Sequence, residues 1–130
     1  MKLLILAKNY ESYNSGYYHQ DWINAIKKSN ECYFWGEGYS FYKKYSHINE
    51  IIYLAKRSLG HIDYIFIMSS WENQNQGEIF DPEPTINFEN VSIPKVFFLN
   101  KEYKKLDEKI EYIKVNQINL VVSVLDSLKE

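Results

Sequence analysis

Cysteine is nearly absent from this sequence. Cys32 is the only cysteine among 130 residues. A disulfide framework needs paired cysteines and a thiolate metal site needs several, so the sequence excludes both. Cys32 lies in the apolar segment "ECYFW", and we interpret it as a small hydrophobic residue of the core.

Long apolar runs are missing as well. The first run, Leu3–Ala7, is shorter than the roughly 7 to 15 apolar residues of an export signal. It is followed by Lys8-Asn9 rather than by a small-residue cleavage site. No later run approaches the ~20 residues of a membrane-spanning helix. We therefore expect a cytoplasmic protein without a membrane span.

Neither sign of charge is in large excess. The chain has 15 basic and 17 acidic residues, which give a net charge of −2, and the basic residues form no long run. This balance argues against nucleic-acid binding. Apolar residues at 45% and charged residues at 25% are typical of a globular protein. The length predicts one domain over residues 1–130.

Glycine-rich phosphate-binding motifs are absent too. The sequence contains neither G-x-G-x-x-G nor G-x-x-x-x-G-K-[ST], so the backbone cradles of dinucleotide and P-loop sites are missing. The three histidines, His19, His47 and His61, are far apart and lack metal-ligand spacing. We expect this chain to bind no cofactor and no metal.

What the sequence does contain is an alternation of apolar strand segments and helical stripes. Expected strands are Leu3–Ala7, Glu31–Trp35, Ile62–Met68, Pro94–Leu99 and Leu120–Val124. Helical spacing occurs around Trp22–Ile26, over Ile48–Leu59 and over Tyr103–Ile113, and Ser69–Ser92 is expected to be irregular. This order predicts an α/β fold, a Rossmann-like three-layer sandwich with a five-stranded parallel sheet and helices on both faces.

Ligands bind such sheets outside the carboxyl ends of the strands. Asn9 follows the first strand, Gly36, Gly38 and Tyr39 follow the second, and Trp71 follows the third. The glycines would let the backbone approach a ligand closely. The aromatic rings could form the walls of a ligand site. The alternative is an ordinary turn whose aromatic residues pack onto the next helix.

Two glutamates on these loops are candidate general bases. Glu72 follows the third strand and Glu102 follows the fourth. A partly desolvated carboxylate there could take a proton from a hydroxyl group. The alternative is a solvated side chain or a helix cap.

The fourth strand opens into the polar stretch "FFLNKEYKK". We expect Asn100 to cap the helix that continues through Leu106. Capping is compatible with ligand contact, so Asn100, Lys101 and Tyr103 are also predicted to bind the ligand.

Three segments together resemble a known family. "YFWGEGY", "LGHIDYIFI" and "IPKVFFLNKEYKKLDEKIEYIK" are similar to the N-terminal domain of bacterial GT-B-type glycosyltransferases of the spore-maturation and family-one-like group. The resemblance spans nearly the whole chain, and residues 93–103 are its most specific part. Position by position, Gly36, Gly38 and Tyr39 match an aromatic turn of the family. Asn100, Lys101, Glu102 and Tyr103 match the polar mouth of its fourth strand.

The resemblance implies an acceptor-side domain. It would bind a saccharide or other hydroxyl-bearing acceptor, with Trp71, Tyr39 and Tyr103 stacking on the sugar rings. A C-terminal domain in cis or in trans would bind a nucleotide-sugar donor. That donor domain is absent from this chain, which is therefore expected to be inactive alone and to self-associate weakly. Relatives place histidines and an aspartate after the fifth strand, where this chain has "VVSVLDS" and keeps only Asp126.

Two other interpretations remain open at this point. One is a non-enzymatic, flavodoxin-like binding or protein-interaction module, which would use its aromatic surface to bind a protein partner. A flavodoxin-like loop with Ser12, Asn14, Ser15 and Gly16 could also hold a phosphate through hydroxyls and amides. The other is an independent enzyme acting on a small ligand.

Overall fold

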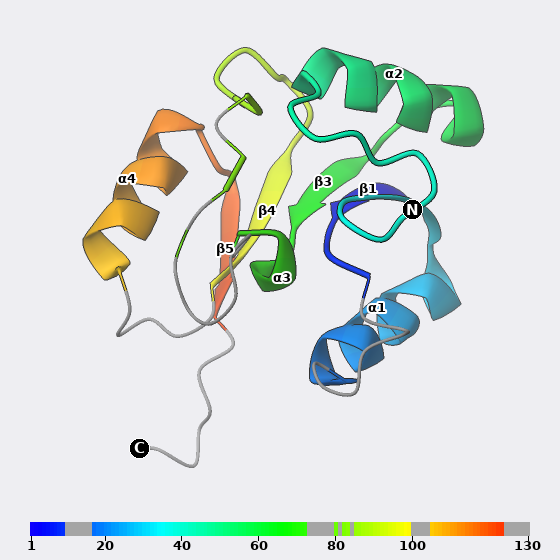
Figure 1. The fold of residues 1–130 in the computed structure, drawn as a ribbon, viewed down its shortest axis with the longest axis horizontal. Coiled ribbons are helices and arrows are strands. Elements are labelled where there is room, and N and C mark those ends of the chain that lie inside the picture. The colour runs from blue at the N-terminus through cyan, green and yellow to red at the C-terminus, as the bar shows by residue number, and fades with distance from the viewer. Residues whose placement is uncertain (10–16, 73–79, 81, 84, 100–104, 124–130) are drawn as a thin grey trace.

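The computed structural model describes residues 1–9, 17–72, 80, 82–83, 85–99 and 105–123, in which strands and helices alternate (Figure 1). The strands are β1 (Lys2–Leu6), β2 (Glu31–Trp35), β3 (Tyr64–Ile67), β4 (Lys95–Leu99) and β5 (Leu120–Ser123). The helices are α1 (Tyr17–Ser29), α2 (Ile48–Leu59), α3 (Ser69–Glu72) and α4 (Leu106–Val115).

The five strands form one parallel sheet in the order β2-β1-β3-β4-β5. The direction of winding reverses once, between β1 and β3, as it does in flavodoxin-like doubly wound sheets. The predicted Rossmann-like α/β fold is confirmed. The crevice where ligands bind such sheets lies at this reversal, outside the carboxyl ends of β1 and β3.

Helices cover both faces of the sheet. Alternate residues of β1 point to opposite faces, and its residues Leu3 to Leu6 are at most 1% exposed. Ile51 and Ala55 of α2 belong to the core on one face, whereas Ile23 of α1 belongs to the core on the other. Figure 1 shows α1 and α2 on opposite sides of the sheet. Burial on both faces explains why β1 is a continuous apolar run.

The ends of α2 follow from the sequence. His47 is the N-cap, and the helix ends at Leu59 because Gly60 adopts φ +92°. The Gly60 N–H then donates to the carbonyl oxygen of Lys56 at 2.8 Å, which satisfies a terminal carbonyl of the helix. The predicted bounds of this helix are confirmed.

The connection between β3 and β4 differs from the prediction. It was expected to be irregular from Ser69 onward, but α3 occupies its first four residues. Further along, Ile86, Phe88 and Val91 are buried in the core on the α2 side. Two tight turns, Ile86 N–H to Glu83 O at 3.2 Å and Val91 N–H to Phe88 O at 3.0 Å, aim these side chains inward. The described part of this connection therefore contributes to the core.

The predicted capping role of Asn100 is wrong for α4. This helix begins at Leu106, and its N-cap is Lys105, which has left-handed dihedral angles (φ 54°, ψ 37°) and makes no side-chain capping bond. The left-handed residue separates α4 from the chain before it. Asn100 itself lies outside the described residues.

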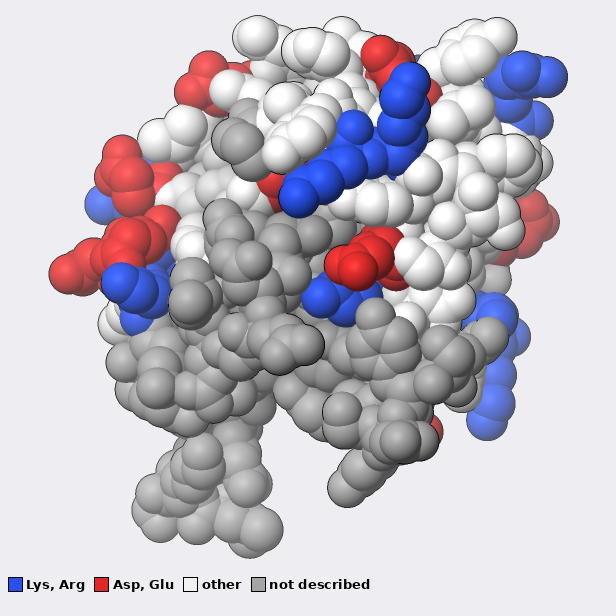
Figure 2. Space-filling view, in the orientation of Figure 1, with Lys and Arg blue, Asp and Glu red and all other residues white. Residues whose placement is uncertain are grey.

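The described surface carries charges of both signs. Figure 2 shows Lys and Arg side chains interspersed with Asp and Glu on one face of the molecule. None of the helices in the described part of the chain is long and apolar enough to cross a membrane.

Candidate functional site

The chain leaving β1 stays paired with the chain leaving β2. Ala7 N–H donates to Trp35 O at 3.1 Å, and Asn9 N–H donates to Glu37 O at 2.9 Å. The Asn9 side-chain amide also donates to Gly38 O at 3.3 Å. An ion pair between Lys8 Nζ and Glu37 Oε2, 3.5 Å apart, adds to this contact. Asn9 is therefore held against the turn after β2, which we call the aromatic turn (residues 36–42).

Two positions of the aromatic turn require glycine. A Cβ atom on Gly36 would lie 1.7 Å from the carbonyl oxygen of Ala7, and one on Gly38 would lie 2.9 Å from the Cβ of Asn9. Their φ angles, +153° and +94°, also disfavour other residues. The sequence predicted that these glycines allow close approach to a ligand. In the structure, the group that approaches closely is the chain after β1.

The aromatic turn places one tyrosine over each face of the sheet. Tyr39 is half-buried and stacks on Phe34, with ring centroids 5.2 Å apart, on the α1 side. Tyr42 packs edge-on against Trp35 at 4.7 Å, on the α2 side. The Tyr42 N–H donates to Tyr39 O at 3.2 Å, so the two rings belong to one rigid turn.

The same loop also carries exposed aromatic residues. Phe41 exposes 69% of its surface and Tyr45 exposes 62%. Trp71, which was predicted to stack on sugar rings, is 1% exposed and packs in the core on the α2 side. Among the described residues, the loop after β2 therefore supplies exposed ring surface at this edge.

The predicted site residues fall into two groups. Those that the structure brings together at the carboxyl edge are Asn9, Gly36, Gly38 and Tyr39. Glu72 ends α3, whose Ser70 hydroxyl accepts the Lys8 N–H at 3.1 Å. The predicted residues Asn100, Lys101, Glu102 and Tyr103, and the phosphate-holding residues 12–16 of the alternative, lie outside the described residues.

Glu83 is a buried acid that the sequence analysis did not find. It is 3% exposed, and the Tyr42 hydroxyl donates to its Oε1 at 2.5 Å. Burial raises the pKa of Glu83, against the opposing effects of the Tyr42 hydrogen bond and of Lys44. Burial likewise raises the pKa of Tyr42. This pair places a titratable carboxyl beside the aromatic turn, where perturbed groups often mark function.

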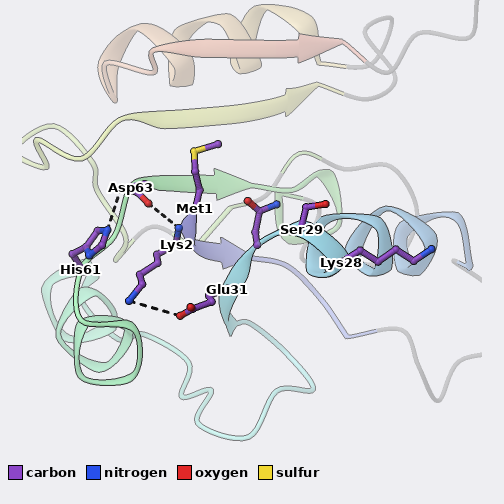
Figure 3. Close-up of a pocket in the computed structure, with 8 residues that line it drawn as sticks. Met1, Lys2, Lys28, Ser29, Glu31, His61 and Asp63 are labelled. Carbon is purple, nitrogen blue, oxygen red and sulfur yellow. Dashed lines mark hydrogen bonds and ion pairs between the residues drawn. The ribbon is translucent and has the colours of Figure 1, made fainter.

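The opposite, amino edge of the sheet holds a cavity of about 500 Å³ (Figure 3). Four of its titratable side chains form two pairs. Lys2 Nζ lies 3.7 Å from Glu31 Oε2, and His61 Nε2 lies 3.3 Å from Asp63 Oδ1. The other Asp63 oxygen accepts the Lys2 backbone N–H at 2.8 Å. The cavity is lined by Met1, Lys2, Lys28, Ser29, Asn30, Glu31, His61 and Asp63.

The described residues contain no group of three or more His, Cys, Asp or Glu side chains placed to hold a metal ion. No protein-family model, curated protein or solved structure matches the chain. The fold and the carboxyl edge define a parallel α/β domain with flavodoxin-like strand order.

Proposed function

We propose that this chain is the acceptor-side domain of a GT-B-type glycosyltransferase. Its carboxyl edge would bind a saccharide or other hydroxyl-bearing acceptor, and a second, C-terminal domain would bind the nucleotide-sugar donor. One observation carries the proposal. Asn9, Gly36, Gly38 and Tyr39, chosen from the sequence for acceptor binding, stand together at the carboxyl edge of the sheet, and Asn9 follows β1, one of the two strands that border the crevice.

The side chains around this cluster suit a saccharide. Phe41 and Tyr45 offer exposed ring faces on the loop after β2, and such faces stack on the apolar faces of sugars. Asn9 and the backbone carbonyls of the aromatic turn supply hydrogen-bonding groups beside them. In the transfer, Glu72 or Glu102 would take the proton of the acceptor hydroxyl while the nucleotide diphosphate leaves the sugar.

Apolar side chains at the far side of the sheet support a docking surface for the second domain. β5 is an edge strand, and Leu120 and Val121 on it are 56% and 38% exposed. Ile110 and Val115 of the neighbouring helix α4 are 40% and 41% exposed. Leu120 and Val121 point to opposite faces of the sheet, so exposed apolar surface is present on both sides of this edge. Exposed apolar surface can mark contact with another domain, and it would also drive the weak self-association expected from the sequence.

An amide NMR titration of the ¹⁵N-labelled chain tests the proposal. One series contains short saccharides and the other contains nucleotide-sugars. We expect saccharides to shift the resonances of the aromatic turn and of Asn9, and nucleotide-sugars to leave them unchanged. Strong shifts with a nucleotide alone, or silence with every saccharide, would refute the acceptor-side assignment.

The strand order favours a second candidate function. The order β2-β1-β3-β4-β5 occurs in flavodoxin-like domains, so the chain would be a non-enzymatic binding or protein-interaction module. A flavin mononucleotide series added to the same titration separates the two. Flavin-induced shifts at the carboxyl ends of β1 and β3, without any saccharide response, would favour the module.

A further inference from the structure

Only one of the two oxygens of the Glu83 carboxyl has a hydrogen-bond partner among the described residues. Its Oε1 accepts the Tyr42 hydroxyl, whereas its Oε2 is buried and has no hydrogen-bond partner among the described residues. Buried polar atoms in folded proteins are hydrogen-bonded in the great majority of cases. A buried carboxyl oxygen without such a partner therefore indicates a bonding group that the described residues do not supply, such as a ligand or a water molecule.

The surroundings place this oxygen in the candidate site. Tyr42 belongs to the aromatic turn, and its ring packs on Trp35, the last residue of β2. The segment that carries Glu83 is tied to the same loop, because the Thr85 hydroxyl donates to Ser46 O at 3.2 Å. Glu83 therefore lies between the loop after β2 and the connection that leads to β4, at the carboxyl edge.

The charged groups near the Tyr42–Glu83 pair indicate which kind of group can bond Glu83 Oε2. Lys44 is the nearby cation, and Glu37 is a second acid that acts on both Glu83 and Tyr42. Tyr45 is a further titratable group that acts on Tyr42. Two acids and one cation disfavour an anionic ligand group. A neutral hydrogen-bonding group faces no such penalty.

We propose that Glu83 Oε2 binds a hydroxyl group of the saccharide acceptor, and that Tyr42 positions the carboxyl for this contact. The inference rests on the proposed function and names the group that recognises the acceptor. A hydroxyl both donates and accepts hydrogen bonds, so it can bond the carboxylate as well as the neutral acid. Because Glu83 is 3% exposed and its Oε2 is closed to solvent in this structure, the contact requires the Tyr42–Glu83 pair to shift toward the surface, and the sugar ring itself stays outside.

The test is an NMR titration of the whole chain with glucose, N-acetylglucosamine, cellobiose and maltotriose. Wild type is compared with Glu83→Leu, Glu83→Gln, Tyr42→Phe and the control Glu50→Gln, which changes an exposed acid in the first turn of α2. We expect Glu83→Leu to weaken saccharide binding roughly tenfold or more. Glu83→Gln should weaken it less, because an amide still bonds a hydroxyl, and Glu50→Gln should bind like wild type.

A second readout needs no substitution at Glu83. In ¹³C-labelled wild type, the side-chain carboxyl resonance of Glu83 should move as the saccharide binds, and that of Glu50 should not. This measurement decides the question even if the leucine variant does not fold.

Each remaining outcome counts against a particular claim. Saccharide binding that is equally strong in wild type and in Glu83→Leu would show that Oε2 bonds only a water molecule, and the acceptor-side function would survive. Weaker binding in both Tyr42→Phe and Glu83→Leu, with a Glu83 carboxyl resonance in wild type that does not move on saccharide binding, would assign the pair a purely structural role in the loop. Absence of any saccharide response in wild type would overturn both the inference and the proposed function.

Discussion

The two edges of the sheet differ in what they leave unsatisfied. The amino edge has a cavity of about 500 Å³, yet Lys2 pairs there with Glu31 and His61 pairs with Asp63. At the carboxyl edge, one oxygen of buried Glu83 has no hydrogen-bond partner among the described residues. Side chains that already pair within the protein leave less chemistry for a ligand than an unsatisfied buried carboxyl at the edge where such sheets bind ligands.

The two edges also differ in how much space surrounds a glycine that has a positive φ angle. At the carboxyl edge, Gly36 has a backbone atom of Ala7 where a side chain would begin. At the amino edge, Gly60 also has a positive φ, but the nearest atom to a Cβ there would be Lys2 Nζ at 3.7 Å. A side chain at Gly36 would thus clash with the backbone of the carboxyl edge, whereas a side chain at Gly60 would fit at the amino edge.

The largest predicted effect follows from this contrast. Gly36→Ala should reduce the free energy of unfolding by roughly 3 kcal/mol or more, because it combines an unfavourable φ with a clash against backbone. Gly60→Ala should cost only about 1 to 2 kcal/mol, from its φ alone. Urea unfolding of both variants measures the difference. Equal costs would mean that the chains after β1 and β2 are not locked together.

Tyr42→Phe should have the next largest effect. It removes the hydroxyl that bonds Glu83 Oε1 and leaves a buried carboxyl without that donor, at a cost of about 1 to 3 kcal/mol. Tyr53→Phe is the matched control, because Tyr53 is 61% exposed on α2 and its ring contact with Arg57 needs no hydroxyl. Its cost should stay within about 0.5 kcal/mol. A loss for Tyr42→Phe no larger than that of the control would contradict the importance of the buried pair.

The two edges should also respond to pH in opposite directions. Burial raises the folded-state pKa of Glu83. The contribution of Glu83 to the free energy of unfolding is therefore complete below its unfolded-state pKa, and it is lost as the pH rises through its folded-state pKa. The Lys2 N–H, aided by His61, lowers the pKa of Asp63. The contribution of Asp63 to the free energy of unfolding is therefore present above its unfolded-state pKa, and it is lost as the pH falls through its folded-state pKa.

Urea midpoints measured from about pH 2 to pH 9 test this pair of signs, since the unfolded carboxyl pKa values are near 4. Glu83→Gln should flatten the fall of stability on the alkaline side of the unfolded pKa. Asp63→Asn should flatten the fall on the acidic side. If Glu83→Gln instead flattened the acidic side, the carboxyl would be stabilised as a charge and the account of its burial would be wrong.

Much of the fold was accessible from the sequence because it depends on local pattern. The apolar run at Leu3–Ala7 indicated a strand buried on both faces, and helical spacing ending at Gly60 set the bounds of α2. The inward turns at Ile86 and Phe88 have no such signal. Isolated apolar residues that show neither helical nor strand periodicity are buried only through contacts with distant strands, and a local sequence pattern does not predict those contacts.

The residues of the candidate site likewise differ in whether a local sequence pattern predicts them. Gly36 and Asn9 were found because both follow strands that a parallel sheet brings to one edge. The burial of Trp71 could not be read from one aromatic residue after a strand. Glu83 was missed because its partner, Tyr42, is 41 residues away, and nothing in "DPEPT" distinguishes a buried acid from a solvated one.

The smallest predicted effect concerns the ion pairs of the amino edge. Glu31→Gln removes the 3.7 Å contact with Lys2, whose Nζ keeps its hydrogen bond to the Leu59 carbonyl. Because the Glu31 side chain is 69% exposed, water and salt screen the pair, and the loss should be about 0.5 kcal/mol or less and should vanish in about 1 M salt. Urea unfolding at low and high salt measures it. A salt-insensitive loss above about 1 kcal/mol would mean that these charges interact in a poorly hydrated cavity, and the amino edge would then compete with the carboxyl edge as a ligand site.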